Sequence, residues 1–235
     1  MRIGVVLQAR MGSTRLPGKT LRPLLGRPMI HYVIERLKRI ELADLVVLAA
    51  PDSRDDAVLK QIALDAGIEY FAGSEADVLD RYYRAADYFS LDHIYRATGD
   101  NPFVEAEIQD DLIRFQLAGD YEYSQNFLSL PHGLGGEVFS REGLRRCWEL
   151  SREAHQREGV NDYILENPMA FRTGKITANP YPRAAMDLQW TVDTLEQFEW
   201  TRTIYEELYE EGGGMRVEQV LDLVSRRSKG LCQVL

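Results

Sequence analysis

The chain has 235 residues, a length that suits one large α/β domain or a domain with a modest insertion. Hydrophobic residues make up 45% of it, and 28 Lys and Arg against 37 Asp and Glu give a net charge of −9. Nucleic-acid-binding proteins carry a basic face, so this balance argues against a nucleic-acid partner. No apolar run approaches the roughly 20 residues that span a bilayer, and no segment resembles a signal peptide. We therefore expect no membrane partner and a cytoplasmic protein.

The first half alternates short β-branched apolar runs with longer amphipathic patterns, which is typical of a parallel sheet with crossover helices. Apolar residues at helical spacing and flanking Gly and Pro residues set the expected boundaries. The expected strands are 3–7, 45–49, 68–71, 93–97 and 121–124, and the expected helices are 28–40, 55–66, 75–90 and 105–118.

The pattern changes after residue 126, where Pro131, Gly133, Gly135 and Gly136 mark a loop. Beyond it we expect strands at 137–140, 171–177 and 188–192, and helices near 141–153, 160–167, 195–211 and 216–227. The fold class is therefore α/β, a Rossmann-like, mostly parallel sheet with helices on both faces. We expect a single domain over residues 1–235, with residues 127–185 as the place for an acceptor-binding or dimerisation insertion.

The loop after the first expected strand concentrates cations, hydroxyls and glycines. In open α/β sheets, ligands bind beyond the carboxyl ends of the strands, where this loop lies. Glycine lets the backbone approach phosphate oxygens, and cations neutralise their charge. The loop carries Arg10, Gly12, Ser13, Thr14, Arg15, Gly18 and Lys19. It is neither a Walker A loop, because Ser13 stands where the first glycine is required, nor a GxGxxG motif. The alternative is a surface turn with solvated cations.

This opening segment, QARMGSTRLPGKTLRPLLGRPMIHYVIERL, resembles the cytidylyltransferase family of CMP-sugar synthetases. It is most similar to the branch named after the spore-coat polysaccharide protein SpsF. The resemblance continues through GSEADVLDRYY, YRATGDNPFVE, GGEVFSREGL, VNDYILENP and WTVDT, and so covers roughly residues 1–200. It implies a glycosyltransferase A-type fold, CTP as the nucleoside triphosphate, Mg²⁺, release of pyrophosphate, and a homodimer.

Two aspartates match the metal-binding positions of that family. Asp100 follows the expected strand 93–97, and Asp193 follows the expected strand 188–192. Mg²⁺ binds one or two protein carboxylates together with phosphate oxygens and water, so this pair is chemically sufficient. The alternatives are a turn residue for Asp100 and a helix N-cap for Asp193.

Phosphoryl-transfer chemistry then assigns the roles. Lys19 and Arg10, with Arg15 as a further candidate, are expected to hold the triphosphate and stabilise the leaving pyrophosphate, and Asp100 and Asp193 to hold Mg²⁺. Further nucleotide-binding candidates, partly implied by the resemblance, are Gln8, Ala9, Gly12, Ser13, Thr14, Gly73, Ser74 and Asp77.

Acceptor-binding candidates are the polar residues Arg96, Asn126 and Glu137 near the ends of expected strands. Arg96 is equally open to pairing with an acid, and Glu137 to facing solvent. The chain departs from the family pattern at Gly135-Gly136, where many members carry acidic residues, and at Asn161-Asp162, where they carry Thr-Pro. These changes leave the acceptor open.

The sequence therefore predicts a Mg²⁺-dependent nucleotidyltransferase that joins CMP to a sugar-type acceptor for surface polysaccharide or glycoconjugate synthesis. Two alternatives remain open: a glycosyltransferase that consumes a nucleotide sugar, and a non-catalytic nucleotide-binding protein. A glycosyltransferase normally needs a second acid near Asp100, and Thr98-Gly99-Asp100-Asn101 has only one.

Overall fold

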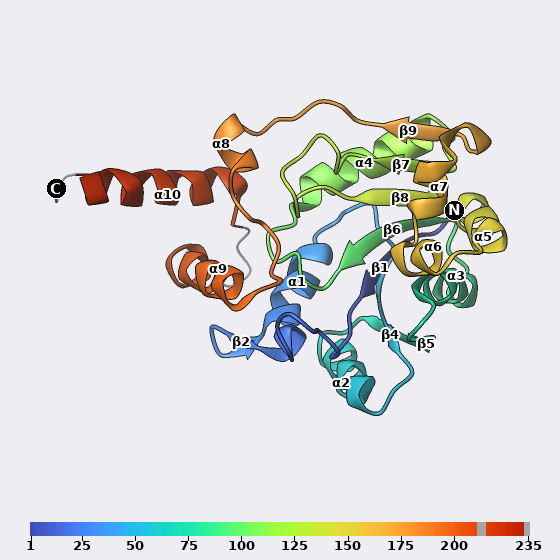
Figure 1. Ribbon diagram of the computed structural model, residues 1–235, viewed down its shortest axis with the longest axis horizontal. Helices are drawn as coiled ribbons and strands as arrows, with labels where there is room; N and C mark the ends of the chain where they lie inside the picture. Colours follow the sequence, from blue (N-terminus) through green and yellow to red (C-terminus); the bar gives the residue numbers. More distant parts are fainter. Residues whose placement is uncertain (211–214, 233–235) are drawn as a thin grey trace.

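A seven-stranded sheet forms the centre of the computed structural model, which describes residues 1–210 and 215–232, with side chains to residue 227 (Figure 1). The strand order is β5-β4-β1-β6-β8-β7-β9. The strands are β1 (Ile3–Gln8), β4 (Leu45–Pro51), β5 (Glu69–Gly73), β6 (His93–Thr98), β7 (Tyr123–Gln125), β8 (Glu137–Ser140) and β9 (Thr173–Lys175). β5, β4, β1 and β6 are parallel, and only β8 runs antiparallel to its neighbours β6 and β7. The predicted mostly parallel α/β sheet is confirmed.

Helices cover both faces of this sheet, as the near-continuous apolar character of the parallel strands requires. Successive side chains of β1 point to opposite faces, so Val5 and Leu7 join one core cluster and Val6 the other. The first face packs against α1 (Met29–Leu37), α2 (Val58–Asp65) and α4 (Ala106–Ala118). The second packs against α3 (Val78–Tyr88), α5 (Arg141–Leu150) and α7 (Asp162–Glu166), with the short α6 (Ala154–Gly159) beside α3.

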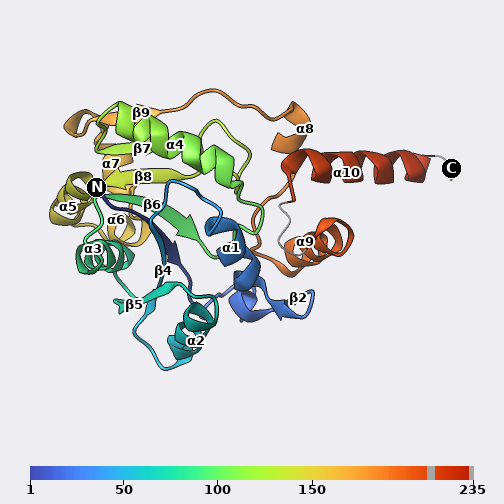
Figure 2. The ribbon, with the colours of Figure 1, turned by 180° about the vertical axis from the view of Figure 1, so that it is seen from behind.

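A third apolar cluster joins the two ends of the chain. α9 (Leu195–Leu208) lies beside α1 (Figure 2). Between them, Tyr205 contacts Tyr32 edge to face at 5.2 Å between ring centroids. Trp190 is fully buried between this region and Phe103. α8 (Arg183–Met186) and α10 (Val217–Cys232) complete this part of the molecule, and α10 projects away from the sheet (Figures 1 and 2).

Several predicted boundaries differ from the structure. Residues 188–192 are not a strand: Val192 N donates to the Asp100 carbonyl at 2.9 Å, but no strand ladder forms, and these residues are apolar because they pack in the third cluster. The helix expected at 141–153 ends at Leu150, the helix expected near 160–167 is α7, and the short α6 between them was not expected. A 3-10 turn (Asp55–Ala57) opens the helix expected at 55–66. The 3-10 helix η1 (Lys19–Leu21) and the small hairpin of β2 (Pro23–Leu24) and β3 (Arg27–Pro28) had no counterpart in the sequence analysis.

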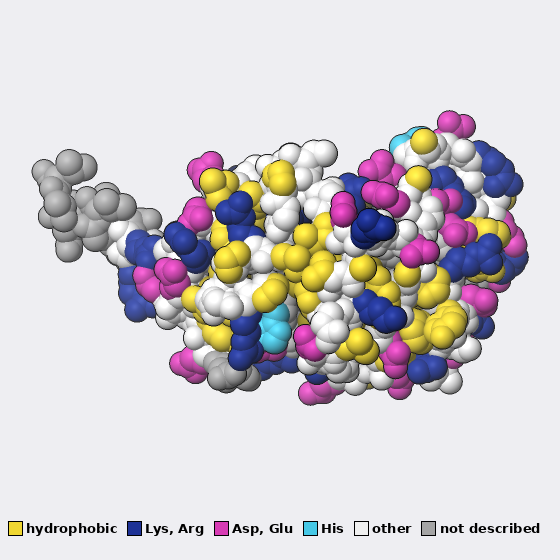
Figure 3. Space-filling model, turned by 90° about the horizontal axis from the view of Figure 1, so that it is seen from below, with side chains coloured by type: hydrophobic (Ala, Val, Ile, Leu, Met, Phe, Trp, Pro, Cys, Tyr) yellow, Lys and Arg dark blue, Asp and Glu magenta, His cyan; other side chains and the backbone are white. Residues whose placement is uncertain are grey.

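The segment expected to hold an insertion, residues 127–185, contributes β8 and β9 to the central sheet as well as α5–α8. Within the part of the chain that is described, no helix combines the length and apolarity that crossing a membrane would take. Basic and acidic side chains intermingle with apolar ones over the face seen in Figure 3.

Candidate active site at the carboxyl edge of the sheet

The loop after β1 is held in place by a glycine turn and by hydrogen bonds with two side chains. Gly18 has a positive φ of 68°, which glycine adopts without strain, and it turns the chain into η1. Thr20 Oγ1 donates to the Arg10 carbonyl at 2.8 Å, and Met11 N donates to Asp56 Oδ1 at 2.7 Å. These contacts fix both ends of the loop, so that Lys19 starts η1 at the carboxyl edge of the sheet.

Lys19 brings the two predicted metal aspartates together. Its Nζ lies 2.8 Å from Asp100 Oδ2 and 2.9 Å from Asp193 Oδ1, and it also donates to the Val192 carbonyl at 2.9 Å. Arg15 adds a second cation, with Nη2 at 2.9 Å from Asp193 Oδ1. Four of the five residues predicted to be catalytic therefore form one cluster.

The charge of Lys19 acts on the neighbouring carboxyl group. Burial alone would raise the pKa of Asp100, but the Lys19 ammonium and its hydrogen bond outweigh burial and hold that pKa below its usual value. Asp100 is therefore ionised at neutral pH, the form in which a carboxylate pairs with Lys19 or binds a metal cation.

The start of α9 positions Asp193. Thr194 is the N-cap and accepts from Gln197 N at 3.3 Å, while Gln197 Oε1 accepts from Thr194 N at 3.0 Å, which together form a capping box. The same Gln197 oxygen accepts from Asp193 N at 2.6 Å. Asp193 thus lies one residue before the N-cap, and its side chain is left for Lys19 and Arg15.

Two cavities meet at this cluster. The first, of about 200 Å³, is lined by the β1 loop, η1 and the start of α3. The second, of about 330 Å³, lies over the ends of β6 and β8 and the loop that follows β7. Four residues line both cavities: Arg15, Thr98, Asp100 and Asp193. A molecule in one cavity and a molecule in the other would face each other across the carboxylates.

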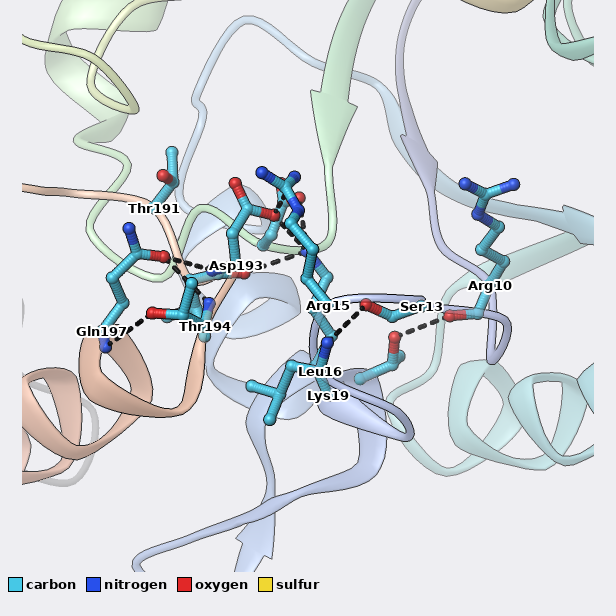
Figure 4. Close-up of polar contacts among 12 residues, drawn as sticks. Arg10, Ser13, Arg15, Leu16, Lys19, Thr191, Asp193, Thr194 and Gln197 are labelled. Atoms are coloured by element: carbon cyan, nitrogen blue, oxygen red, sulfur yellow. Dashed lines mark hydrogen bonds and ion pairs between the residues drawn. The ribbon is translucent and has the colours of Figure 1, made fainter.

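The first cavity gathers most of the nucleotide-binding candidates. The predicted residues that line it are Gln8, Ala9, Arg10, Ser13, Thr14, Arg15, Lys19, Asp100 and Asp193. Figure 4 shows Arg10 on the far side of the loop from Asp193, with its guanidinium pointing away from the cluster.

Four predicted nucleotide-binding residues do not line this cavity. Gly12 is exposed in the loop, and Gly73 closes β5, where its carbonyl accepts from Asp52 N at 2.7 Å. Ser74 contributes its carbonyl to Arg81 at 2.5 Å. Asp77 is the N-cap of α3, and its side chain accepts from Asp80 N at 2.8 Å and pairs with Arg157. The predicted contacts of these four residues with a nucleotide stay predictions.

Arg81 was not among the predicted site residues. It lies in α3 with its side chain buried against the first cavity. Burial lowers the pKa of Arg81 below its ordinary value. Its Nε has no hydrogen-bond partner among the described residues, and the same holds for Gln8 Oε1. An unpaired buried polar atom of this kind was invisible in the sequence, where Arg81 is simply a charged residue in a helix.

Two of the acceptor-binding candidates lie side by side in the second cavity. Arg96 Nη1 donates to Glu137 Oε1, while Tyr123 donates its hydroxyl to Glu137 Oε2 at 2.6 Å. Burial would lower the pKa of Arg96, but the charge of Glu137 raises it above its ordinary value. The third candidate, Asn126, is buried and accepts from Gly136 N at 2.7 Å rather than lining the cavity.

Asn161, noted in the sequence only as a departure from the family pattern, lines the second cavity. Its Nδ2 donates to Glu137 Oε2 at 2.7 Å and to the Tyr123 hydroxyl at 3.1 Å. Other residues lining this cavity that the sequence did not indicate are Asn101, Phe127, His132 and Thr191.

The donor set at the junction of the cavities fits a hard divalent cation. The described residues contain no group of three or more His, Cys, Asp and Glu side chains placed to hold a metal. Asp100 and Asp193 supply two carboxylates whose oxygens share one cationic partner, the Lys19 ammonium. Two carboxylates completed by phosphate oxygens and water are the environment that Mg²⁺ prefers.

Two solved structures share the fold of this chain. A cytidylyltransferase structure from Leptospira borgpetersenii matches with a TM-score of 0.88 and 28% identity over 97% of this chain and 96% of that one. A structure of CMP:2-keto-3-deoxy-manno-octonic acid synthetase complexed with CTP matches with a TM-score of 0.67 over 88% of this chain and 99% of that one. The latter is 18% identical, so it shows a shared fold.

Comparison of the sequence with known proteins points to the same family as the structural match to a cytidylyltransferase. The chain is 34% identical over 208 residues to the spore coat polysaccharide biosynthesis protein SpsF of Bacillus subtilis, which covers 86% of this chain and 85% of the relative. The model of the cytidylyltransferase family matches residues 4–221. With its nucleotidyltransferase fold and its cationic loop facing two carboxylates, the chain belongs to the cytidylyltransferase family.

Proposed function

We propose that the protein transfers CMP from CTP to a sugar-type acceptor with release of pyrophosphate, in the synthesis of a surface polysaccharide or glycoconjugate. The observation that carries this proposal is the pair of cavities that share Asp100 and Asp193 as a common wall. A transferase for two substrates needs two sites that meet at the reacting atoms, and here they meet at the carboxylates.

The first cavity has the chemistry of a triphosphate site. Arg10, Arg15 and Lys19 line it, and Ser13 and Thr14 add hydroxyl donors from the same loop. Cations placed around a leaving pyrophosphate stabilise the charge that develops on it, and this is the main contribution that proteins make to phosphoryl transfer. CTP as the nucleotide is supported by membership of the cytidylyltransferase family and by the CTP complex of the fold relative.

The proposed reaction is an in-line displacement. An acceptor oxygen bonds to the α-phosphorus, the bond from that phosphorus to the bridging oxygen of the β-phosphate breaks, and pyrophosphate leaves with that oxygen while the acceptor proton is released to solvent. Arg10, Lys19 and Arg15 hold the phosphates, and residues of the second cavity orient the acceptor. Mg²⁺ held by Asp100 and Asp193 would neutralise phosphate charge and lower the pKa of the attacking hydroxyl.

The second cavity is the proposed acceptor site. Arg96 and Glu137 form an ion pair on its wall, and His132, Asn161 and Thr191 add polar groups suited to a polyhydroxylated molecule. A sugar-type acceptor is supported by the role of SpsF in polysaccharide biosynthesis and by the sugar acid named for the CTP-bound fold relative.

A thermal-shift screen with CTP, UTP, ATP and GTP in the presence of Mg²⁺ tests the nucleotide. We expect CTP to give the largest shift, and a purine-selective shift would overturn the choice of base. Pyrophosphate release with CTP, Mg²⁺ and a panel of sugars and sugar acids, including 3-deoxy-manno-octulosonate, tests the reaction. Transfer from a nucleotide sugar without pyrophosphate would instead favour a glycosyltransferase.

Replacing the shared carboxylate tests the site independently of the acceptor's identity. We expect Asp193→Ala to lower kcat by on the order of 10²-fold or more, the effect of removing a group that stabilises charge in the transition state. Glu196→Ala, an exposed carboxylate in the first turn of α9, is the matched control. Unchanged turnover in Asp193→Ala would show that the assignment of the site is wrong.

A homodimer, with residues 127–185 supplying dimer or acceptor contacts, is also proposed on the resemblance to the family. Light scattering coupled to size-exclusion chromatography measures it directly. We expect a mass of twice 26.9 kDa.

A further inference from the structure

The Lys19 ammonium has three N–H donors, and the structure gives each of them an acceptor. These acceptors are Asp100 Oδ2, Asp193 Oδ1 and the Val192 carbonyl, all between 2.8 and 2.9 Å from Nζ. An ammonium has no further donor. Only 14% of the Lys19 side chain is exposed, so this is a satisfied, largely buried position rather than a passing surface contact. In this position Lys19 has nothing left to offer a phosphate.

The charges of the cluster balance without any ligand. Asp100 and Asp193 carry two negative charges, and Lys19 and Arg15 supply two positive ones within 2.9 Å. A divalent cation bound to the carboxylates alone would meet the Lys19 ammonium at the same oxygens. Because like charges at contact distance repel strongly in a partly buried site, one of the two cations has to leave.

The first cavity gives Lys19 a second place to bind only when a triphosphate is present. Lys19 lines that cavity together with Arg10 and Arg15, so without an anion the charges of the two arginines disfavour a position of its ammonium away from the aspartates. A triphosphate brings several negative charges into it. Lys19 can then move from the carboxylates to the phosphates, and the carboxylates become free for a divalent cation.

We propose that Lys19 is an internal placeholder for the divalent cation, so that Asp100 and Asp193 bind a metal strongly only when a nucleoside triphosphate has taken Lys19 away. This inference rests on the proposed nucleotidyltransferase function, but it concerns the order of binding rather than the reaction. The movement of Lys19 couples the binding of the nucleotide to the binding of the metal, in addition to any direct contact between the two ligands. By linkage the coupling is reciprocal: the metal raises nucleotide affinity by the same factor.

Manganese binding to the nucleotide-free protein tests the placeholder directly. The free Mn²⁺ signal in electron paramagnetic resonance is followed during titration of the wild-type protein, Lys19→Met and the control Lys60→Met, which removes an exposed lysine on α2. We expect Lys19→Met to bind Mn²⁺ on the order of tenfold more tightly than the wild type, within the usual range of such couplings. Lys60→Met should match the wild type.

Two further variants locate the effect. Arg15→Gln should tighten Mn²⁺ binding by a smaller factor, because Arg15 is 68% exposed and contacts only one of the two aspartates. Adding Asp193→Asn to Lys19→Met should abolish the gain. If the gain survives, the metal binds elsewhere and the proposal fails.

The proposal is also overturned if folded Lys19→Met binds Mn²⁺ no more tightly than the wild type. Should Lys19→Met fail to fold, as judged by circular dichroism, Arg15→Gln decides, and an unchanged affinity there rejects the proposal. Failure of the proposed function would be seen in a different measurement, the absence of CTP-dependent pyrophosphate release. That result does not depend on the affinity of the nucleotide-free protein for Mn²⁺.

Discussion

Val160 has a backbone φ of 70° and ψ of −50°, and Asn161 N donates to the Gly159 carbonyl at 2.9 Å, which closes a γ-turn with positive φ. A β-branched residue in this conformation is strained, at a cost of about 1–3 kcal/mol. The Val160 side chain is fully buried in the cluster around α3 and α5, and this packing holds the turn. The result is an Asn161 side chain directed at Glu137 in the wall of the second cavity.

Asn161→Ala tests the energetic weight of this arrangement. The change removes a donor from Glu137 Oε2 and from the Tyr123 hydroxyl, both buried, so we expect the free energy of unfolding to fall by about 1–3 kcal/mol. Urea denaturation measures it. Gln61→Ala, which removes an exposed amide on α2, should change stability by less than about 0.5 kcal/mol. If the two variants lowered the free energy of unfolding equally, the buried hydrogen bonds of Asn161 would contribute no more to stability than an exposed amide does.

At the scale of elements, the start of α9 links helix stability to the carboxylate that the site needs. Thr194→Ala removes the N-cap of that helix, and we expect a loss of about 0.5–2 kcal/mol in unfolding free energy. Thr203→Ala is the matched control within α9, where alanine favours the helix and the change should be neutral or stabilising. Urea denaturation of both variants measures the difference, and a Thr194→Ala protein as stable as Thr203→Ala would contradict the role of the cap.

Glu122 ties the turn after α4 to α5 and to the chain entering β9. Its carboxylate accepts from Arg172 N at 2.9 Å and pairs with Arg146. Burial opposes ionisation, but these hydrogen bonds and charges together hold the pKa of Glu122 below its ordinary value of 4.5. The stability it contributes is therefore present above pH 4.5 and is lost as the pH falls through the lower folded-state pKa.

The comparison of the wild type with Glu122→Gln isolates this effect. We expect the difference in unfolding free energy to be constant above about pH 5 and to narrow below about pH 4.5, because only the wild type takes up the proton. Chemical denaturation between pH 7 and pH 3 measures it. Glu107→Gln, an exposed acid on α4, should give a difference that stays flat. If the difference in unfolding free energy between the wild type and Glu122→Gln grew as the pH fell, the pKa of Glu122 would not be lowered by folding.

At the scale of the whole molecule, two core clusters cover the two faces of the sheet, and a third joins the β1 loop, β2 and α1 to α8, α9 and α10. Leu16 and Leu24, near the amino end, and Trp190, near the carboxyl end, belong to this third cluster. Lys19 and Asp193 approach each other only because the cluster brings these distant segments together. The geometry of the site therefore depends on the packing of both ends of the chain.

This arrangement makes the expected single domain testable. We expect tryptophan fluorescence, which reports on Trp148 beside α3 and on Trp190 and Trp200 in the third cluster, to follow the same unfolding curve as far-UV circular dichroism. A shared curve means that the third cluster and the sheet unfold together. Separate midpoints would show that the carboxyl-terminal part is a second cooperative unit.

The sequence by itself determined the parallel half of the sheet and the chemistry of the first cavity. Largely apolar runs such as Ile3–Gln8 and Leu45–Pro51 have few other ways to bury both faces, and a loop dense in Gly, Lys and Arg that follows such a strand indicates an anion. The same reasoning failed at residues 188–192, because burial in a helical cluster and burial in a sheet produce the same apolar pattern.

Only the tertiary structure decided what the charged residues contact. Lys19 meets Asp100 across 81 positions and Asp193 across 174, and no local pattern specifies such pairs. The same holds for Asn161, whose place beside Glu137 depends on a strained turn at Val160. Sequence periodicity reports which face of an element is buried, whereas the partner of a polar side chain is set by how the elements pack, since hydrogen bonds and ion pairs form only at contact distance.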